Sequence, residues 1–292
     1  MAHQAGFVTI IGRPNVGKST LMNALVGEKL SIITHKAQTT RHRIFGIVSG
    51  ENFQVVLSDT PGVIKPHYGM QSGMMRFVNR ALEDADLFLL LTDPFDKPEG
   101  MATVLHDVRN SGIPVMLVIN KMDLVKPEEI EKIPERWQKL VQVNEVLAIS
   151  ALQQTNMELL LERLIAYMPA SPAFYPKDQI TDQPERYFVS EIIREKILLQ
   201  YKQEVPYSIE VMVEGFQEEE ELIRILANIY VNKKSQKPIL LGKGGQAIKK
   251  LGTAAREDVE TFLGKQVYLE LQVKIRPDWR DDPTYLKRFG YK

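Results

Sequence analysis

The chain has 292 residues, of which 44% are apolar, and it carries 37 basic and 37 acidic side chains. This length and apolar content predict two folded domains and exclude a disordered chain, while the zero net charge excludes a protein that coats nucleic acid by bulk charge but leaves room for a local basic patch. The absence of cysteine excludes disulfides and thiolate zinc sites.

The start of the sequence and its apolar runs indicate where the protein works. Residues 1–6 lack the basic start and apolar core of a secretory signal. The longest apolar runs, among them residues 87–91, are far shorter than the roughly 20 residues that a helix needs to span a bilayer. We therefore expect a cytoplasmic protein.

Strands and helices are predicted to alternate through the first 170 residues. Short apolar runs typical of strands in a largely parallel sheet lie at residues 7–11, 87–91, 115–119 and 146–149. Two more, at 44–48 and 53–57, flank a hairpin-like turn. Amphipathic helical stretches lie between the runs, at 19–25, 74–83, 103–110, 127–141 and 156–167. This alternation predicts a doubly wound α/β domain.

A glycine-containing string follows the first predicted strand and opens the first predicted helix. It reads Gly12, Arg13, Pro14, Asn15, Val16, Gly17, Lys18, Ser19 and Thr20. Gly12 and Gly17 let backbone N–H groups close around phosphate oxygens, and the start of the helix adds further N–H groups. Lys18 supplies charge to the β- and γ-phosphates, and the Ser19 hydroxyl can coordinate Mg²⁺. This context predicts a nucleotide-binding phosphate loop rather than a plain glycine turn before a helix.

A second string follows the predicted strand 115–119 and identifies the base. It consists of Asn120, Lys121, Met122 and Asp123. The Asp123 carboxylate can accept hydrogen bonds from the guanine N1–H and 2-amino groups, a donor pair that adenine lacks. After the next strand, the backbone of Ser150, Ala151 and Leu152 can reach the guanine 6-oxo group. Taken alone, Asp123 is compatible with a helix cap, but together with the phosphate loop it predicts GTP and GDP rather than the ATP of a P-loop kinase.

The string Asp59, Thr60, Pro61 and Gly62 follows the predicted strand 53–57. Alone it is typical of a turn, but its order after the phosphate loop suggests a second role. Asp59 can hold a water bound to Mg²⁺, and the Gly62 N–H can reach the γ-phosphate. We therefore expect Asp59 at the metal and Gly62 among the groups that act in catalysis, together with Lys18.

The loop before the hairpin is predicted to be a switch. A threonine there can contact Mg²⁺ and the γ-phosphate only while GTP is intact, so that hydrolysis releases the loop. We expect Thr40 to make this contact and to act in catalysis, with Thr39 as the alternative for the contact. The predicted metal ligands are therefore Ser19, Thr40 and Asp59. Arg41 is expected to be solvated or salt-bridged, and an internal arginine finger is the alternative.

Two residues bear on the rate of hydrolysis. Ras-like GTPases place a glutamine after the glycine that corresponds to Gly62, and this glutamine orients the attacking water. Here the residue is Val63, which cannot form that hydrogen bond, so we expect slow intrinsic turnover. Asn15 offers a side-chain oxygen near the bridge between the β- and γ-phosphates. In this it resembles the GTPases that recruit K⁺, so K⁺ is a candidate second cation.

The composition changes between residues 168 and 184, where four prolines occur. Such a segment is typical of an extended linker. We therefore divide the chain into a nucleotide-binding domain at 1–170, a linker at 171–183 and a smaller α+β domain at 184–292. In that domain we predict a helix at 185–200, strands at 207–216, 222–232 and 267–275, and a short helix within 279–291. Residues 222–226 are also compatible with a helix start.

A glycine-lysine string lies between an apolar run and an amphipathic helix in the second domain. It contains Gly242, Lys243, Gly244 and Gly245, and Lys249 and Lys250 follow in the helix. Glycines at both ends of a GXXG loop let the backbone lie close to about four nucleotides of single-stranded RNA, as in KH domains. Six lysines and no acidic residue occur between residues 232 and 250. The alternative is a helix-turn-helix corner with a solvated lysine face.

Seven strings together resemble the Era family, GTPases of bacterial ribosome assembly, over nearly the whole chain. They are GRPNVGKST at 12–20, AQTTRHRI at 37–44, DTPG at 59–62, NKMD at 120–123, SEIIREK at 190–196, LLGKGGQAIKKLG at 240–252 and FGYK at 289–292. The resemblance implies a P-loop GTPase domain followed by a type II KH domain. It also implies binding to the 3′ end of the small-subunit ribosomal RNA and a role in maturing the small ribosomal subunit.

The resemblance further implies peripheral contact with the inner face of the cell membrane, and we expect a monomer. A different kind of protein remains as the alternative: a binding protein whose GTP hydrolysis is incidental to its contact with RNA. An RNA-dependent change in the GTPase rate would separate this protein from a true switch.

Overall fold

The computed structural model describes residues 2–34, 36, 38–98 and 100–291. Met1 and Lys292, at the outer ends of the predicted domains, and Ala37, in one of the family strings, lie outside these ranges. The chain divides into two compact units, the first made of residues 1–67 and 74–182 and the second of residues 68–73 and 183–292. The predicted division into domains at 1–170 and 184–292 with a linker at 171–183 stays a prediction, distinct from these two units.

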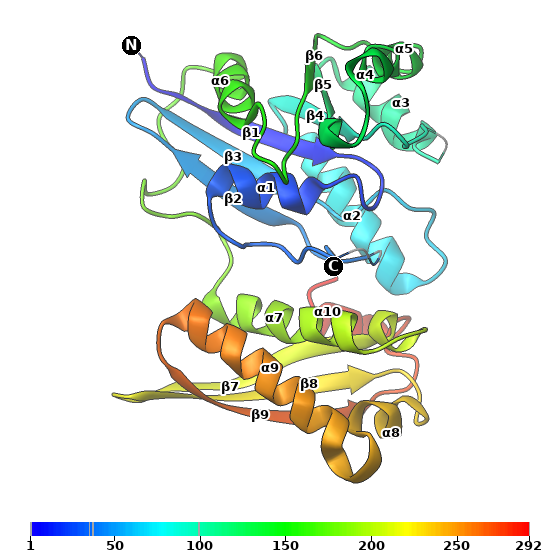
Figure 1. Cartoon of the computed structure of the whole chain (residues 1–292), viewed down its shortest axis with the longest axis vertical. Helices are drawn as coiled ribbons and strands as arrows, with labels where there is room; N and C mark the ends of the chain where they lie inside the picture. Colours follow the sequence, from blue (N-terminus) through cyan, green and yellow to red (C-terminus); the bar gives the residue numbers. More distant parts are fainter. Residues whose placement is uncertain (1, 35, 37, 99, 292) are drawn as a thin grey trace. The chain divides into compact units, whose positions relative to one another are not determined.

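The first unit is built on a six-stranded sheet (Figure 1). Its strands, in spatial order, are β2 (Ile44–Ser49), β3 (Phe53–Asp59), β1 (Gln4–Ile11), β4 (Leu87–Thr92), β5 (Val115–Ile119) and β6 (Glu145–Ala148). Only the pairing of β2 with β3 is antiparallel among the described strands of this sheet. All the residues of β4 and β5 are buried, and apart from Thr92 at the end of β4 they are apolar, so these strands do not alternate.

Helices cover both faces of this sheet, as expected for a doubly wound fold. They are α1 (Lys18–Val26), α2 (Gly69–Glu83), α3 (Ala102–Ser111), η1 (Met122–Leu124), α4 (Pro127–Ile130), α5 (Ile133–Gln138) and α6 (Met157–Tyr167). Side chains of α2, α3 and α5 share a core with β4 and β5, whereas α1 and α6 contact each other and β3. The expected single helix at 127–141 is wrong: it is split into α4 and α5, because Pro134 has no N–H to continue the first helix.

The segment after α6 lies along the edge of the sheet. Ile47 N donates to Ile180 O at 2.9 Å, and Phe45 N donates to the Asp182 carboxylate at 3.2 Å, so that the segment covers the free side of β2. Buried Gln54 holds it further back, accepting from the backbone N–H groups of Phe174 and Tyr175. The proline-rich stretch, with a turn closed by the hydrogen bond from Gln179 N to Pro176 O, satisfies hydrogen bonds that an edge strand would leave open.

The second unit combines a three-stranded sheet with helices on one face (Figure 1). Its elements are α7 (Glu185–Gln200), η2 (Val205–Tyr207), β7 (Ile209–Glu218), β8 (Leu222–Val231), α8 (Gln236–Leu241), η3 (Lys243–Gly245), α9 (Gln246–Leu263), β9 (Gln266–Ile275) and α10 (Pro283–Arg288). Strand β8 is central, antiparallel to β7 and parallel to β9. Residues 222–226 therefore begin a strand and not a helix, and the α+β prediction is confirmed.

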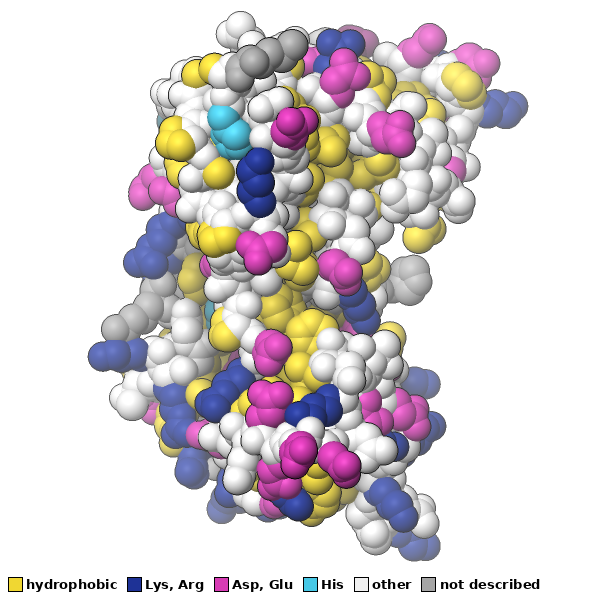
Figure 2. Space-filling model, turned by 90° about the vertical axis from the view of Figure 1, so that its left-hand side faces the viewer, with side chains coloured by type: hydrophobic (Ala, Val, Ile, Leu, Met, Phe, Trp, Pro, Cys, Tyr) yellow, Lys and Arg dark blue, Asp and Glu magenta, His cyan; other side chains and the backbone are white. Residues whose placement is uncertain are grey.

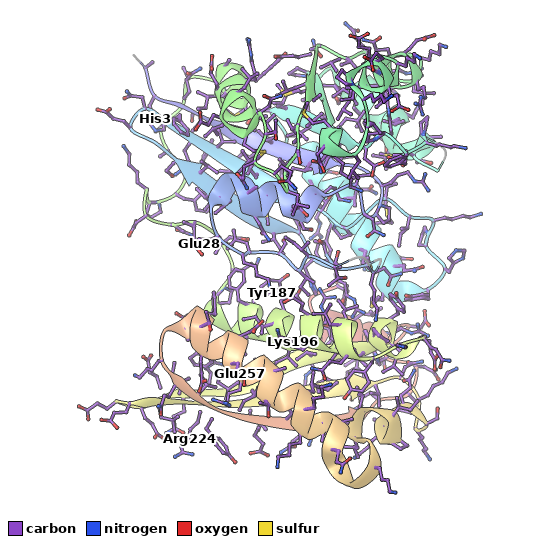
Figure 3. All side chains as sticks on the ribbon, viewed as in Figure 1. His3, Glu28, Tyr187, Lys196, Arg224 and Glu257 are labelled. Carbon is purple, nitrogen blue, oxygen red and sulfur yellow. The ribbon has the colours of Figure 1, made fainter. Side chains whose placement is uncertain are left out.

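The core of the second unit follows from the spacing of its apolar residues. On α7, Val189, Ile193 and Ile197 recur every fourth position and are fully buried against the sheet. Alternate residues of β8 face the same core. Beside this core, Lys196 of α7 forms an ion pair with Asp258 of α9 at 2.5 Å, which joins the two helices. Figure 3 labels Lys196, and it labels Glu257, the residue before Asp258.

The surface carries both signs of charge. On the face drawn in Figure 2, basic and acidic side chains are interspersed, as the equal numbers of the two kinds lead one to expect. Among the residues that the structure describes, no helix has both the length and the apolar character needed to cross a bilayer.

Candidate nucleotide site and nucleic-acid interface

The predicted phosphate loop joins the end of β1 to the start of α1. Asn15 and Gly17 have left-handed backbones, with φ of 68° and 104°. A Cβ atom at Gly17 would lie 2.3 Å from the Asn120 side chain, and one at Gly12 would lie 2.5 Å from Leu91 O. Both glycines are therefore required by close packing of the loop, and Gly17 also by its backbone conformation.

Lys18 is buried inside this loop. Its ammonium group donates to Gly12 O at 3.1 Å and to Arg13 O at 3.0 Å. Burial lowers the pKa of Lys18 to about 8, although the charges of Asp59 and Asp96 oppose that shift. An anion placed against the loop would favour the charged form of Lys18, so the site gains electrostatic stability when it binds phosphate.

Three hydroxyl groups converge on one carboxylate oxygen. The hydroxyls of Ser19, Ser31 and Thr40 donate to Asp59 Oδ2 at 2.9, 3.1 and 3.2 Å, and Ser19 Oγ lies 2.8 Å from Thr40 Oγ1. Asp59 is fully buried, and its Oδ1 atom has no hydrogen-bond partner among the described residues. Burial raises the pKa of Asp59, while the Lys18 charge and the three hydroxyls lower it.

This cluster fits a hard cation. Oxygen ligands are those that Mg²⁺ prefers, and Asp59 Oδ1 is a buried acceptor that such an ion, or water bound to it, would satisfy. The structure brings together all three predicted metal ligands, and it is Thr40 whose hydroxyl reaches Asp59. Arg41 beside it is buried, so of the two expected states the solvated one is excluded and the salt-bridged one stays a prediction. Ser31 was missed, because no motif of the sequence contains it.

The segment after β3 packs on the phosphate loop. The Thr60 hydroxyl donates to Ile10 O at 3.0 Å, and Val63 N approaches Gly12 O at 3.4 Å. A Cβ atom at Gly62 would lie 2.7–3.0 Å from three atoms of Pro14. Gly62 therefore packs directly on the phosphate loop, and a larger residue there would clash with it.

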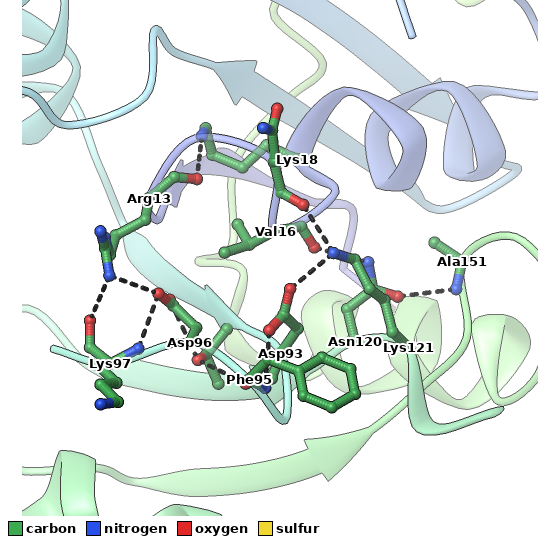
Figure 4. Close-up of polar contacts among 12 residues, drawn as sticks. Arg13, Val16, Lys18, Asp93, Phe95, Asp96, Lys97, Asn120, Lys121 and Ala151 are labelled. Carbon is green, nitrogen blue, oxygen red and sulfur yellow. Dashed lines mark hydrogen bonds and ion pairs between the residues drawn. The ribbon is translucent and has the colours of Figure 1, made fainter. Parts of the chain in front are cut away.

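The predicted base loop is tied to the phosphate loop by Asn120. Its amide donates to Val16 O at 2.9 Å and accepts from Ala151 N at 3.0 Å, joining three loops (Figure 4). Lys121 donates to Asn15 O at 2.7 Å. Asp123 lies in η1 and is exposed, and Leu152 beside Ala151 is 75% exposed. The edge that would face a base is thus open, with the carboxylate of Asp123 at its surface.

The sequence reasoning also missed two carboxylates, Asp93 and Asp96. Asp93 accepts from Lys121 at 2.6 Å, and Asp96 accepts from Arg13 at 3.2 Å. Asp93 follows β4 directly and Asp96 lies in the same loop, and the carboxyl ends of parallel strands are where ligands bind in open α/β sheets. That position was the signal by which they could have been found.

The glycine-lysine loop of the second unit joins α8 to α9. Gly242, Gly244 and Gly245 have φ of 72°, 57° and 77°. A Cβ atom at Gly242 would lie 2.6 Å from that of Ala247, so the turn depends on glycine there. Lys243, Lys249 and Lys250 lie along the turn and the start of α9, and all three are exposed. The turn belongs to a unit that is built on a three-stranded sheet, against which α7 and α9 pack. The alternative of a helix-turn-helix corner therefore does not describe this unit.

Comparisons with known proteins match both units. A family model described as a 50S ribosome-binding GTPase matches residues 7–121, and a KH-domain model matches residues 204–280. GTPase Era of Caldanaerobacter subterraneus is 45% identical, with 100% of this chain and 99% of that protein covered. The chloroplastic GTPase ERA1 of Zea mays is 47% identical over 99% of this chain and 71% of its own length.

Two solved structures share the fold over 99% of both chains, each with a TM-score of 0.94. One is Era in complex with MgGDPNP and nucleotides 1506–1542 of 16S ribosomal RNA, which is 37% identical to this chain. The other is a single-residue variant of Era of Aquifex aeolicus bound to GDP·AlF4⁻, which is 36% identical.

Proposed function

The chain belongs to the Era family of GTPases, and from this premise we propose that it couples GTP hydrolysis in its first unit to RNA binding by its second. The RNA is the single-stranded 3′ end of the small-subunit ribosomal RNA, and the process is assembly and maturation of the small ribosomal subunit. One observation supports the GTPase part most strongly: Ser19, Thr40 and Asp59 converge beside buried Lys18 at the ends of β1 and β3.

We assign nucleotide binding to four loops at this edge of the sheet. The phosphates lie against the loop made of Gly12, Arg13, Pro14, Asn15, Val16, Gly17, Lys18, Ser19 and Thr20 and against the segment made of Asp59, Thr60, Pro61 and Gly62. The base lies against the loops made of Asn120, Lys121, Met122 and Asp123 and of Ser150, Ala151 and Leu152. Asn120 supports this assignment, because its amide joins the phosphate loop to Ala151.

The residues of this site explain how hydrolysis proceeds. Ser19, Thr40 and Asp59 would hold Mg²⁺, which when bound would neutralise charge on the phosphates. Lys18 and the Gly62 N–H act where negative charge develops on the transferred group. Val63 cannot orient water, so positioning and charge carry catalysis and intrinsic turnover is slow. The Thr40 hydroxyl, which donates to Asp59, places the switch loop beside the predicted metal ligands. Loss of the γ-phosphate would release this loop.

We also propose K⁺ as a second cation beside the phosphate loop. The Asn15 side chain supports this assignment, because it offers a neutral amide oxygen, which can act as a cation ligand, within the phosphate loop. A turnover rate that is the same in Na⁺ and in K⁺ would contradict it.

RNA binding is assigned to the loop and helix that carry Gly242, Lys243, Gly244, Gly245, Lys249 and Lys250. The bare backbone of the turn can approach sugar and phosphate, and the lysines add charge to phosphate oxygens. The related Era structure contains nucleotides of 16S ribosomal RNA, which supports the same kind of RNA for this chain. We further propose a cytoplasmic monomer with peripheral contact to the inner face of the membrane.

The test is GTP turnover by the full chain with and without an oligonucleotide of the small-subunit rRNA 3′ end. Coupling predicts that the oligonucleotide changes the rate and that Gly242→Asp removes this change. Lys287→Ala, which removes an exposed lysine from α10 of the same unit, is the control that keeps it. If RNA binds without changing turnover, the chain is an RNA-binding protein whose hydrolysis is incidental, and the coupling is refuted.

A further inference from the structure

The loop after β4 contacts both halves of the proposed nucleotide site (Figure 4). It consists of Asp93, Pro94, Phe95, Asp96 and Lys97, and we call it the brace loop. Its two carboxylates form ion pairs with Lys121 of the base loop and Arg13 of the phosphate loop. The phosphate loop and the base loop, which are far apart in the sequence, are therefore both bound to the brace loop.

The first contact fixes Lys121. Asp93 Oδ2 accepts from Lys121 Nζ at 2.6 Å, and the same ammonium donates to Asn15 O at 2.7 Å. Asp93 Oδ1 accepts from Phe95 N at 3.0 Å, so the backbone of the brace loop fixes the carboxylate that aims the lysine. The Asp93 side chain is only 9% exposed, which shields this pair from solvent.

The second contact fixes Arg13. Arg13 Nη1 donates to Asp96 Oδ1 at 3.2 Å and to Lys97 O at 3.0 Å, and Lys97 N donates to the same carboxylate at 2.9 Å. Burial raises the pKa of Asp96, and the Lys97 N–H and the Arg13 charge oppose that shift. The Arg13 side chain thus pairs with the brace loop, and it is the backbone of Arg13 that lines the phosphate loop.

We propose that Asp93 and Asp96 are positioning residues for guanine nucleotide binding, which hold the phosphate loop and the base loop at a fixed separation through Arg13 and Lys121. This inference rests on the proposed nucleotide site. A nucleotide that bridges two loops pays for ordering them unless they are already held, so the brace lowers that cost. Loss of preorganisation of this kind acts mainly on dissociation.

The test measures release of fluorescent mant-GDP from the full chain by stopped-flow fluorescence. Asp93→Asn keeps the size of the side chain and removes its charge. We expect release about tenfold faster, as for the loss of one charge-assisted hydrogen bond. Because Arg13 is 41% exposed, Asp96→Asn should have a smaller effect, about threefold. In steady state, KM for GTP should rise while kcat stays unchanged.

Two controls separate positioning from a general loss of structure. Glu135→Gln breaks an exposed ion pair with Lys139 in the same unit, and Phe95→Ala removes a 66%-exposed ring from the brace loop itself. Both should release mant-GDP at the wild-type rate. Melting of the nucleotide-free Asp93→Asn protein should stay a single cooperative transition, and Asp93→Glu should recover part of the slow release.

A double-mutant cycle keeps the inference falsifiable if Asp93→Asn fails to fold. Arg13→Gln, Asp96→Asn and the double variant should release nucleotide at similar rates, because each breaks the same contact. Rates that multiply would overturn the brace, and so would wild-type release from a folded Asp93→Asn protein. A wild-type chain that fails to bind mant-GDP would instead overturn the proposed nucleotide site.

Discussion

Replacement of Gln54 should detach the segment after α6 from the sheet and destabilise the first unit. The side chain is fully buried and makes four hydrogen bonds. Its oxygen accepts from Phe174 N at 2.8 Å and Tyr175 N at 3.0 Å, and its nitrogen donates to Tyr175 O at 2.9 Å and Ser49 Oγ at 3.0 Å. At about 1 kcal/mol for each net hydrogen bond, Gln54→Met should lower the free energy of unfolding by about 3–4 kcal/mol.

Methionine is the sharpest replacement because it fills nearly the same volume and removes only the polar groups. The assay is urea unfolding followed by tryptophan fluorescence. The chain has two tryptophans, Trp137 in the first unit and Trp279 in the second, so a Trp279→Phe background lets Trp137 report the first unit alone. Gln142→Met, at an exposed position, is the matched control and should shift stability by less than about 0.5 kcal/mol. A similarly small shift for Gln54→Met would refute the reasoning.

Further predictions concern the two sites. The pKa of Lys18 is about 8 in the folded protein and 10.5 ordinarily, so between these pH values the unfolded chain binds more protons than the folded one. The free energy of unfolding of the nucleotide-free protein should therefore rise with pH in that window. Lys18→Met should remove this rise and abolish GTP binding; a rise that persists in its urea titrations would contradict the assignment. Val63→Gln should speed single-turnover hydrolysis severalfold, and an already fast rate that stays unchanged would refute the slow-turnover account. Replacing Lys243, Lys249 and Lys250 by alanine should make the slope of log affinity for single-stranded RNA against log salt concentration shallower by about 2, because each lost phosphate contact changes it by about 0.7. An unchanged slope would show that the RNA binds elsewhere.

Local patterns predicted most of the fold because each strand and helix has its own signal. The apolar runs marked β4 and β5 to within a residue, since strands buried on both faces need no alternation. The period of apolar residues marked α7 without error. The nucleotide motifs were found for the same reason, because each is a short string at the end of a strand.

Features that depend on tertiary contacts could not be predicted. Helix α2 begins at Gly69, five residues before the predicted start, because glycines at 69 and 73 weaken the helical signal. The second unit accounts for those glycines: a Cβ atom at Gly69 would lie 3.0 Å from Arg280 O, and one at Gly73 would lie 2.9 Å from Tyr291. Ser31 reaches Asp59 across the fold, so no spacing in the sequence marks it.

The most direct test of the nucleotide site is an exchange of base preference at Asp123. Its carboxylate is assigned to the N1–H and 2-amino donors of guanine, whereas an amide at this position can donate to the 2-oxo group of xanthine. Asp123→Asn should therefore lose GDP affinity at least about a hundredfold and bind xanthosine diphosphate more tightly than GDP in equilibrium titrations. A variant that still prefers GDP would show that Asp123 does not read the base.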